Sequence, residues 1–107
     1  MNQGKKDDSG KLRFDLLPSA ALKEVVRVYT IGAAKYEDRN WEKGLDWGRV
    51  FAAMQRHSWD WWNGEEYDPT DGQHHLASVA WCALALIHYE LNNIGKDTRS
   101  IRNDEND

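Results

Sequence analysis

Residues 56–78 contain an unusual concentration of side chains that can bind a metal ion or transfer a proton. Three of the four histidines in the chain fall in this stretch, together with five acidic residues and three of the six tryptophans. A 107-residue domain does not need so many ionisable groups between two helices in order to fold. The stretch therefore predicts a polar site for a metal ion, a phosphate or both.

The loop in this stretch contains a pair of carboxylates at a spacing suited to a metal ion. Glu65 and Asp68 form an ExxD pattern, with Glu66 and Asp71 close by. Carboxylates at this spacing can share a hard cation such as Mg²⁺. The alternative interpretation is a solvated acidic loop in which Asp71 caps the following helix.

Two histidines flank this loop, one on each of the neighbouring predicted helices. His57 lies in mid-helix, with Asp60 three residues later to orient it, and His75 lies one turn into the next helix. Antiparallel packing of the two helices would bring His57 and His75 face to face near Glu65 and Asp68. We expect these four residues to bind the metal, with Glu65, His57 and Asp68 as catalytic candidates. The alternative is a pair of hydrogen-bonded core histidines.

A second candidate cluster lies earlier in the chain and has the residue types of a nucleotide pocket. Lys35 and Arg39 can contact phosphate oxygens, and Asn40 offers an amide that can read a purine edge. Tyr36 and Trp41 can stack on a base. The alternative is an interhelical loop with aromatic anchors.

Two further arginines are candidates for contacts with the phosphates of a nucleotide. Arg13 follows Lys11 on the N-terminal arm, and Arg56 precedes His57 directly. The guanidinium group is suited to phosphate oxygens because it donates two parallel hydrogen bonds.

Three helices must position these side chains. Apolar spacing and Pro18 predict a first helix over about residues 18–35, with Leu22, Val25, Val26, Tyr29 and Ala33 as its apolar stripe. A second helix follows the N-cap candidate Asp46 and ends at Gly64. Its predicted buried stripe comprises Trp47, Val50, Phe51, Met54, Ser58 and Trp61.

The third helix, over about residues 72–93, is apolar on most sides, with Asp71 as its predicted cap and Gly95 at its end. An extended arm before the first helix is expected to pack Leu12, Phe14 and Leu16 onto the body. The result is an all-α bundle of three main helices, completed by oligomerisation because one side of the third helix stays uncovered. Residues 11–94 form the domain, between a flexible start (1–10) and a flexible polar tail (95–107).

Composition excludes several classes of function. The net charge of −4, from 14 basic and 18 acidic residues, argues against binding a nucleic-acid polymer. The single cysteine, Cys82, cannot form an internal disulfide and sits in an apolar run that does not favour a nucleophile. The polar N-terminus lacks a signal peptide, and the longest apolar run is too short to span a membrane. We therefore expect a cytoplasmic protein, in a host cell if a phage encodes it.

Five motifs in order resemble a known family. They lie at residues 10–18 (GKLRFDLLP), 32–41 (GAAKYEDRNW), 56–57 (RH), 64–68 (GEEYD) and 74–77 (HHLA). Together they resemble the phage and prophage dATP/dGTP diphosphohydrolase N-terminal family, from residue 10 to about residue 92. The resemblance implies purine deoxynucleotide hydrolysis, which releases a monophosphate and pyrophosphate with Mg²⁺ or Mn²⁺. It also implies a relationship to the all-α MazG-like pyrophosphohydrolases.

The chain departs from the MazG-like pattern at the metal ligands. Such enzymes show Glu-Leu-Ala-Asp-Val where this chain has His75, Ser78 and Val79, and the earlier helix offers Arg56, His57 and Asp60 in place of two glutamates. Three hypotheses follow. The first is a metal-dependent pyrophosphohydrolase of purine dNTPs. The second is a non-catalytic protein that sequesters a nucleotide or nucleotide signal in phage–host conflict. The third is a structural helical module whose tryptophans form a subunit interface.

Overall fold

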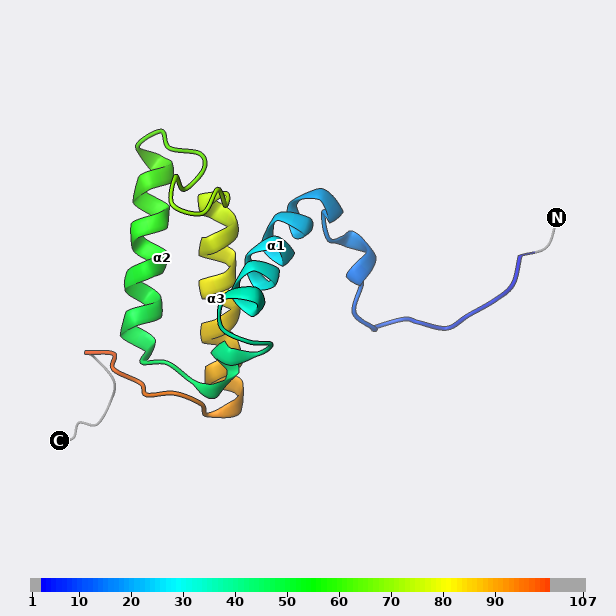
Figure 1. Cartoon of the computed structure of the whole chain (residues 1–107). Helices are drawn as coiled ribbons and strands as arrows, with labels where there is room; N and C mark the ends of the chain where they lie inside the picture. Colours follow the sequence, from blue (N-terminus) through cyan, green and yellow to red (C-terminus); the bar gives the residue numbers. More distant parts are fainter. Residues whose placement is uncertain (1–2, 101–107) are drawn as a thin grey trace.

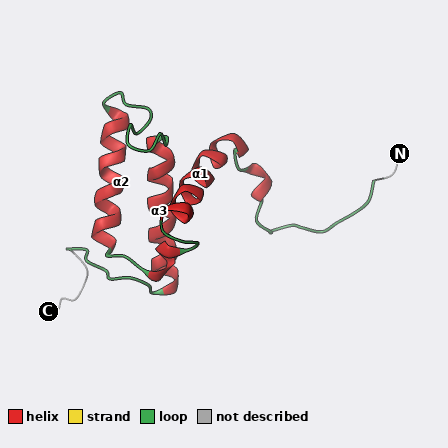
Figure 2. Cartoon of the chain, viewed as in Figure 1, coloured by secondary structure: helices red, strands yellow, loops and turns green. Residues whose placement is uncertain are grey.

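The computed structural model describes residues 3–100 and consists of helices joined by loops (Figure 1). Its elements are the 3-10 helices η1 (Phe14–Leu16) and η2 (Asn40–Lys43) and the α-helices α1 (Ser19–Lys35), α2 (Trp47–Trp62) and α3 (His75–Asn92). Within the described residues only isolated β-bridges occur, and no strand is drawn (Figure 2). The all-α prediction is confirmed.

Helix α3 packs against both other long helices, and its buried face forms the core. α2 runs antiparallel beside it, and α1 crosses it on another side (Figure 1). Ala77, Cys82, Ala85 and Tyr89 on this face are buried, and α2 adds Val50. Small residues at three of these positions let the helix axes approach closely.

Four of the six residues in the predicted stripe of α2 are at least partly buried: Trp47, Val50, Met54 and Ser58. Val50 is buried, and Met54 packs beside it, whereas Phe51 and Trp61 are exposed. In the single chain α2 has one long helix beside it, so only one narrow face is covered. Leu84, Ile87 and Leu91 of α3 are exposed for the same reason, Leu91 by 79%.

The start of α3 lies three residues later than predicted. His74, not Asp71, is the N-cap, and its Nδ1 accepts a hydrogen bond from the Leu76 N–H at 3.0 Å. Asp71 instead accepts from the Gln73 N–H at 2.9 Å and closes a turn within the loop. A β-bridge between Tyr67 and His74 keeps the chain extended up to the cap, so the helix cannot begin earlier.

Aromatic side chains close the C-terminal end of α3. Trp41 of η2 lies with its ring centroid 4.9 Å from that of His88 and 6.1 Å from that of Tyr89, and Tyr29 and Trp81 complete the cluster. The Tyr89 hydroxyl donates to the Trp41 carbonyl at 2.6 Å. This end of the molecule is therefore fixed by packing and one buried hydrogen bond.

The predicted packing of the N-terminal arm is wrong. Leu12, Phe14 and Leu16 are 81%, 72% and 70% exposed. The arm extends away from the helices (Figure 1), and residues 14–16 coil into η1, with an ion pair between Arg13 and Asp15 beside it. Within residues 3–100, no other segment covers these apolar side chains.

Residues 96–98 of the predicted polar tail contact the start of α2. The Trp47 N–H donates to the Lys96 carbonyl at 2.9 Å, and the Gly48 N–H donates to Thr98 Oγ1 at 2.8 Å. Gly95 permits the preceding turn because its φ is +78°, and a Cβ there would lie 2.4 Å from the Leu45 carbonyl oxygen. Residues 101–107 of the predicted tail lie outside the described residues.

Candidate functional site

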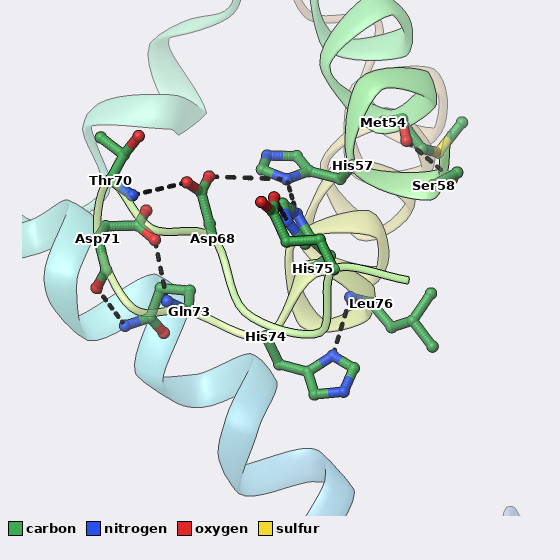
Figure 3. A network of polar contacts seen from close by, with 11 residues as sticks. Met54, His57, Ser58, Asp68, Thr70, Asp71, Gln73, His74, His75 and Leu76 are labelled. Carbon is green, nitrogen blue, oxygen red and sulfur yellow. Dashed lines mark hydrogen bonds and ion pairs between the residues drawn. The ribbon is translucent and has the colours of Figure 1, made fainter. Parts of the chain in front are cut away.

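Two imidazole rings meet at the N-terminal end of α3. His57 comes from the middle of α2 and His75 is the first residue of α3, and their Nδ1 atoms are 2.9 Å apart (Figure 3). The ring centroids are 5.1 Å apart. These distances agree with the expectation that the two histidines lie opposite each other, with their ring planes inclined by 48°.

Glu65 determines which nitrogen of His75 carries a proton. Its Oε1 lies 2.7 Å from His75 Nε2. An ionised carboxylate only accepts hydrogen bonds, so Nε2 is the protonated nitrogen and Nδ1 of the neutral ring carries a lone pair. His57 Nδ1–H then donates to that lone pair. His75 is 1% exposed, whereas Glu65 is 46% exposed, so the carboxylate links a buried ring to the surface.

Asp68 approaches the pair from the other side. Its Oδ2 lies 4.0 Å from His57 Nδ1, and its Oδ1 accepts from the Thr70 N–H at 2.8 Å (Figure 3). The bond from the Thr70 N–H is the main cause that lowers the pKa of Asp68 below its usual value. Asp68 is therefore a carboxylate at neutral pH, held by its own turn.

Burial keeps His57 neutral. Desolvation lowers the pKa of His57 below its ordinary value, the nearby His75 lowers it further, and the charge of Asp68 opposes both. A neutral imidazole offers a lone pair to a metal ion or a proton acceptor. The site thus presents neutral nitrogens beside negative oxygens.

The loop between α2 and α3 positions both carboxylates. Gly64 and Gly72 have positive φ, +105° and +75°, and turn the chain at its two ends. The His75 N–H donates to the Glu66 carbonyl at 3.1 Å, and the Asp68 N–H donates to the Gln73 carbonyl at 2.8 Å. These backbone bonds put Glu65 and Asp68 on either side of the histidine pair.

Two overlapping groups of side chains can hold a metal ion within the described residues. In the first, one ligand atom each from His57, Asp68 and His75 lies within 4.8 Å of the others. The second group consists of Asp60, Glu65 and His75 with the same limit. The four predicted metal ligands, His57, Glu65, Asp68 and His75, therefore lie together, and their binding of metal stays a prediction.

The loop of residues 35–41, which was predicted to bind a nucleotide, lies away from the histidine pair. Trp41 packs against His88 and Tyr89, thirteen and fourteen residues further along α3 than His75. A helix rises about 1.5 Å per residue, so the two regions are about 20 Å apart. The Lys35 ammonium group lies 5.2 Å from the centre of the exposed Tyr36 ring, and Arg39 pairs with Glu42. Asn40 begins η2 in the same region.

The other two residues predicted to contact phosphate lie on different elements of the structure. Arg56 is exposed on α2, one residue before His57. Arg13 lies on the arm and binds both oxygens of Asp15, at 2.8 and 2.7 Å. Of the predicted substrate-binding residues, only Arg56 adjoins the histidine pair in the sequence.

A hollow beside the histidine pair was missed by the sequence analysis. It measures about 480 Å³, within the usual range for ligand sites, and is lined by Lys23, Val26, Arg27, Thr30, Ile31 and Gln73. Gln73 connects it to the site, because its carbonyl accepts the Asp68 N–H. The available signal was the pair of cations four residues apart, Lys23 and Arg27, on the predicted first helix.

Cys82 takes no part in this chemistry. The thiol is buried in the core, and burial raises its pKa to about 11. A thiol of that pKa stays protonated at neutral pH and is a poor nucleophile, in agreement with the expectation from its apolar surroundings.

The sequence of this chain matches a described protein family. The profile of the family described as "dATP/dGTP diphosphohydrolase, N-terminal" matches residues 1–99. The chain belongs to this diphosphohydrolase N-terminal family. A dATP/dGTP diphosphohydrolase of Salmonella phage PMBT28 is 37% identical over 90 residues, which are 84% of this chain. The chain spans only 30% of the length of that relative.

The family assignment confirms the resemblance that the five motifs indicated. Two further findings are negative. No solved structure matches the chain. Among the described residues, no helix has the length and apolar character required to cross a membrane. Both the histidine pair and the loop of residues 35–41 lie inside the region that the family profile covers.

Proposed function

We propose that this family member hydrolyses purine deoxynucleoside triphosphates to the monophosphate and pyrophosphate with a divalent metal ion, Mg²⁺ or Mn²⁺. The observation that carries the proposal is the cluster of His57, His75, Asp68 and Glu65, assembled from two helices and their connecting loop. The name of the phage relative gives the substrate class.

The side chains around the cluster divide the work of the reaction. A bound divalent ion would supply positive charge for the phosphate oxygens. His57, His75 and Asp68 would hold it, and Lys23 and Arg27 beside the hollow would bind the phosphate chain. Because the hollow adjoins the cluster through Gln73, we place the phosphates there.

Glu65 is the proposed general base. One of its oxygens is bonded to His75, and the group is 46% exposed, so water can reach the carboxylate. The water oxygen bonds to the α-phosphorus, the bond from that phosphorus to the α–β bridging oxygen breaks, and pyrophosphate leaves. The proton of the water passes to Glu65. With an ion bound, His57 would carry its proton on Nε2, so that the Nδ1 lone pair faces the ion.

The test of this function is a survey of substrates. The purified protein is incubated with each of the four dNTPs plus Mg²⁺ or Mn²⁺, and pyrophosphate is measured. We expect release from dATP or dGTP, loss of turnover in Glu65→Gln and an unchanged helical spectrum in that variant. Tight nucleotide binding without turnover would exclude hydrolysis by this chain.

A second function is favoured by the length comparison. Because the chain spans 30% of the phage relative, the hydrolytic residues of that protein can lie in the part with no counterpart here. The chain would then bind a nucleotide without cleaving it. Under this function, a purine nucleotide raises the melting temperature of wild type and Glu65→Gln alike, because ligand binding stabilises the folded state.

We also propose that the chain works as a homo-oligomer. Leu84, Ile87 and Leu91 on α3, together with Leu12 and Phe14 on the arm, are exposed in the single chain. Covering such side chains stabilises an assembly by about 25 cal/mol per Å² of apolar surface. Light scattering after size exclusion measures the mass directly, and Leu91→Asp should lower it if α3 lies in the interface. A monomer at all concentrations would reject the proposal.

A further inference from the structure

The ligand atoms at the histidine pair differ from those that Mg²⁺ prefers. Mg²⁺ binds almost entirely through oxygen atoms and keeps several of its waters. Imidazole nitrogens suit the later divalent transition ions better than they suit Mg²⁺. Here two imidazoles, His57 and His75, turn the same nitrogen toward each other and toward one carboxylate, Asp68.

The distances allow one ion to bind all three groups. Metal–ligand bonds of about 2.0–2.2 Å put neighbouring ligand atoms about 3 Å apart. The two Nδ1 atoms are 2.9 Å apart, and Asp68 Oδ2 lies 4.0 Å from His57 Nδ1. An inward shift of Asp68 by about 1 Å, small for a side chain on a loop, completes the set.

Glu65 acts on the second nitrogen of His75. The 2.7 Å bond to Nε2 leaves the Nδ1 lone pair of His75 directed at His57. This carboxylate–histidine arrangement is the usual support for a metal-bound histidine, where it fixes the tautomer and raises basicity. Glu65 thereby supports the site without joining the ligand set.

We propose that His57 Nδ1, His75 Nδ1 and Asp68 Oδ2 bind one divalent transition ion of the Fe²⁺–Zn²⁺ series in preference to Mg²⁺, with Glu65 as a positioning residue. The inference refines the metal site of the proposed function. It rests on that function only for the claim that the bound ion takes part in hydrolysis. It revises both the expected ion, Mg²⁺, and the expected role of Glu65 as a ligand.

The second grouping fits an ion less well. Asp60 and Glu65 are exposed carboxylates, and exposed acidic groups are common without a metal. Glu65 also already bonds the Nε2 atom of His75. In the first grouping His57, Asp68 and His75 are all at least partly buried, so an ion there would be shielded from water.

The test measures metal binding directly, on untagged full-length protein without nucleotide. Co²⁺ and Zn²⁺ are titrated by calorimetry, and the visible absorption of Co²⁺ reports its ligands. We expect one ion per chain, nitrogen-ligated Co²⁺ absorption, a raised melting temperature and no displacement by a hundredfold excess of Mg²⁺.

Variants separate the roles of the residues. His57→Gln and Asp68→Asn should lose most binding, whereas Glu65→Gln should bind one ion about 10–100-fold more weakly with similar Co²⁺ absorption. Asp60→Asn and His88→Gln are matched controls and should bind as wild type. Because His75 is buried, it is left unchanged, and circular dichroism checks that each variant folds.

Two results would overturn the inference. One is Mg²⁺ competing with Co²⁺ at similar concentrations. The other is binding lost in Asp60→Asn and Glu65→Gln but retained in His57→Gln, which would assign the ion to the second grouping. Metal binding without pyrophosphate release would leave this inference standing and reject hydrolysis. Pyrophosphate release that requires only Mg²⁺, from protein that binds no Co²⁺ or Zn²⁺, would support hydrolysis and reject this inference.

Discussion

The two ends of α3 each hold a histidine against a ring from another element, but in different surroundings. At the N-terminal end His75 meets His57, between Glu65 and Asp68. At the C-terminal end His88 lies edge-on to Trp41, in a cluster of aromatic rings. The first pair is fixed by hydrogen bonds to a loop, and the second by burial of apolar surface. One end is therefore suited to chemistry and the other to stability.

The largest expected effect tests the role of the aromatic end in stability. Tyr89 is fully buried, so Tyr89→Ala should lower the free energy of unfolding by about 3–5 kcal/mol through the cavity it leaves. Urea denaturation followed by circular dichroism measures the change. His57→Gln serves as the comparison from the other end. A greater loss in His57→Gln would mean that the site, and not the aromatic cluster, stabilises the fold.

A smaller change isolates one hydrogen bond at the same end. Tyr89→Phe keeps the ring but leaves the Trp41 carbonyl without the hydroxyl that bonds it at 2.6 Å. The Trp41 carbonyl still accepts from the Gly44 N–H at 3.1 Å, so we expect a loss of about 0.5–1.5 kcal/mol in the same denaturation experiment, the usual net contribution of one hydrogen bond. No measurable loss would show that water replaces the hydroxyl and that the ring alone fixes this end.

The next prediction concerns pH. Because the pKa of His57 is lower in the folded state than its ordinary value of 6.5, the unfolded chain takes up the proton more readily. The stability contributed by neutral His57 is complete above pH 6.5 and is lost as the pH falls below it, by at most about 1.4 kcal/mol per pH unit. The melting temperature should therefore fall between about pH 7.5 and about pH 5.5.

Matched histidine variants test whether His57 causes that pH dependence. His57→Gln should reduce the slope, and His88→Gln should retain it while losing about 0.5–1.5 kcal/mol of ring packing. The lowered pKa of Asp68 acts in a more acidic range, below its ordinary value of 3.8, and does not contribute in this window. Equal slopes in wild type and His57→Gln would contradict a neutral, partly buried His57.

The smallest effect on stability decides where the nucleotide binds. Arg27 lines the hollow near the histidine pair, and Arg39 lies in the loop at the aromatic end. Each pairs with a nearby glutamate at the surface, so Arg27→Ala and Arg39→Ala should each change stability by less than about 1 kcal/mol. We expect Arg27→Ala alone to weaken dATP or dGTP binding in a calorimetric titration. The opposite result would assign the nucleotide to the loop of residues 35–41.

Much of the fold could be predicted because its signals are local. Pro18, Asp46, Gly64 and Gly95 delimited the helices to within a few residues. The pairing of His57 with His75 followed from antiparallel helices joined by a loop of known length. Such signals predict the folded structure well because each depends only on residues within a few turns of the same helix.

The rest depended on contacts between distant segments. Helix α3 starts later than predicted because Tyr67 forms a β-bridge with His74. Trp41 packs in an aromatic cluster whose members cannot be recognised from local sequence spacing. The hollow beside Lys23 and Arg27 needs Gln73, some fifty residues later in the chain. Apolar side chains on the arm predicted burial, but the part of the chain that the structure describes offers no surface that covers them.

The bonded row Glu65–His75–His57 has a kinetic consequence. His75 is 1% exposed and cannot exchange protons with water directly. Because His75 Nε2–H donates to Glu65 and His75 Nδ1 accepts from His57, a proton on His57 Nδ1 can pass to His75 while the Nε2 proton of His75 passes to Glu65 at the surface, along contacts of 2.9 and 2.7 Å. The interior ring therefore equilibrates with the solvent without any opening of the helices, and a proton released at one end of the row is available at the other.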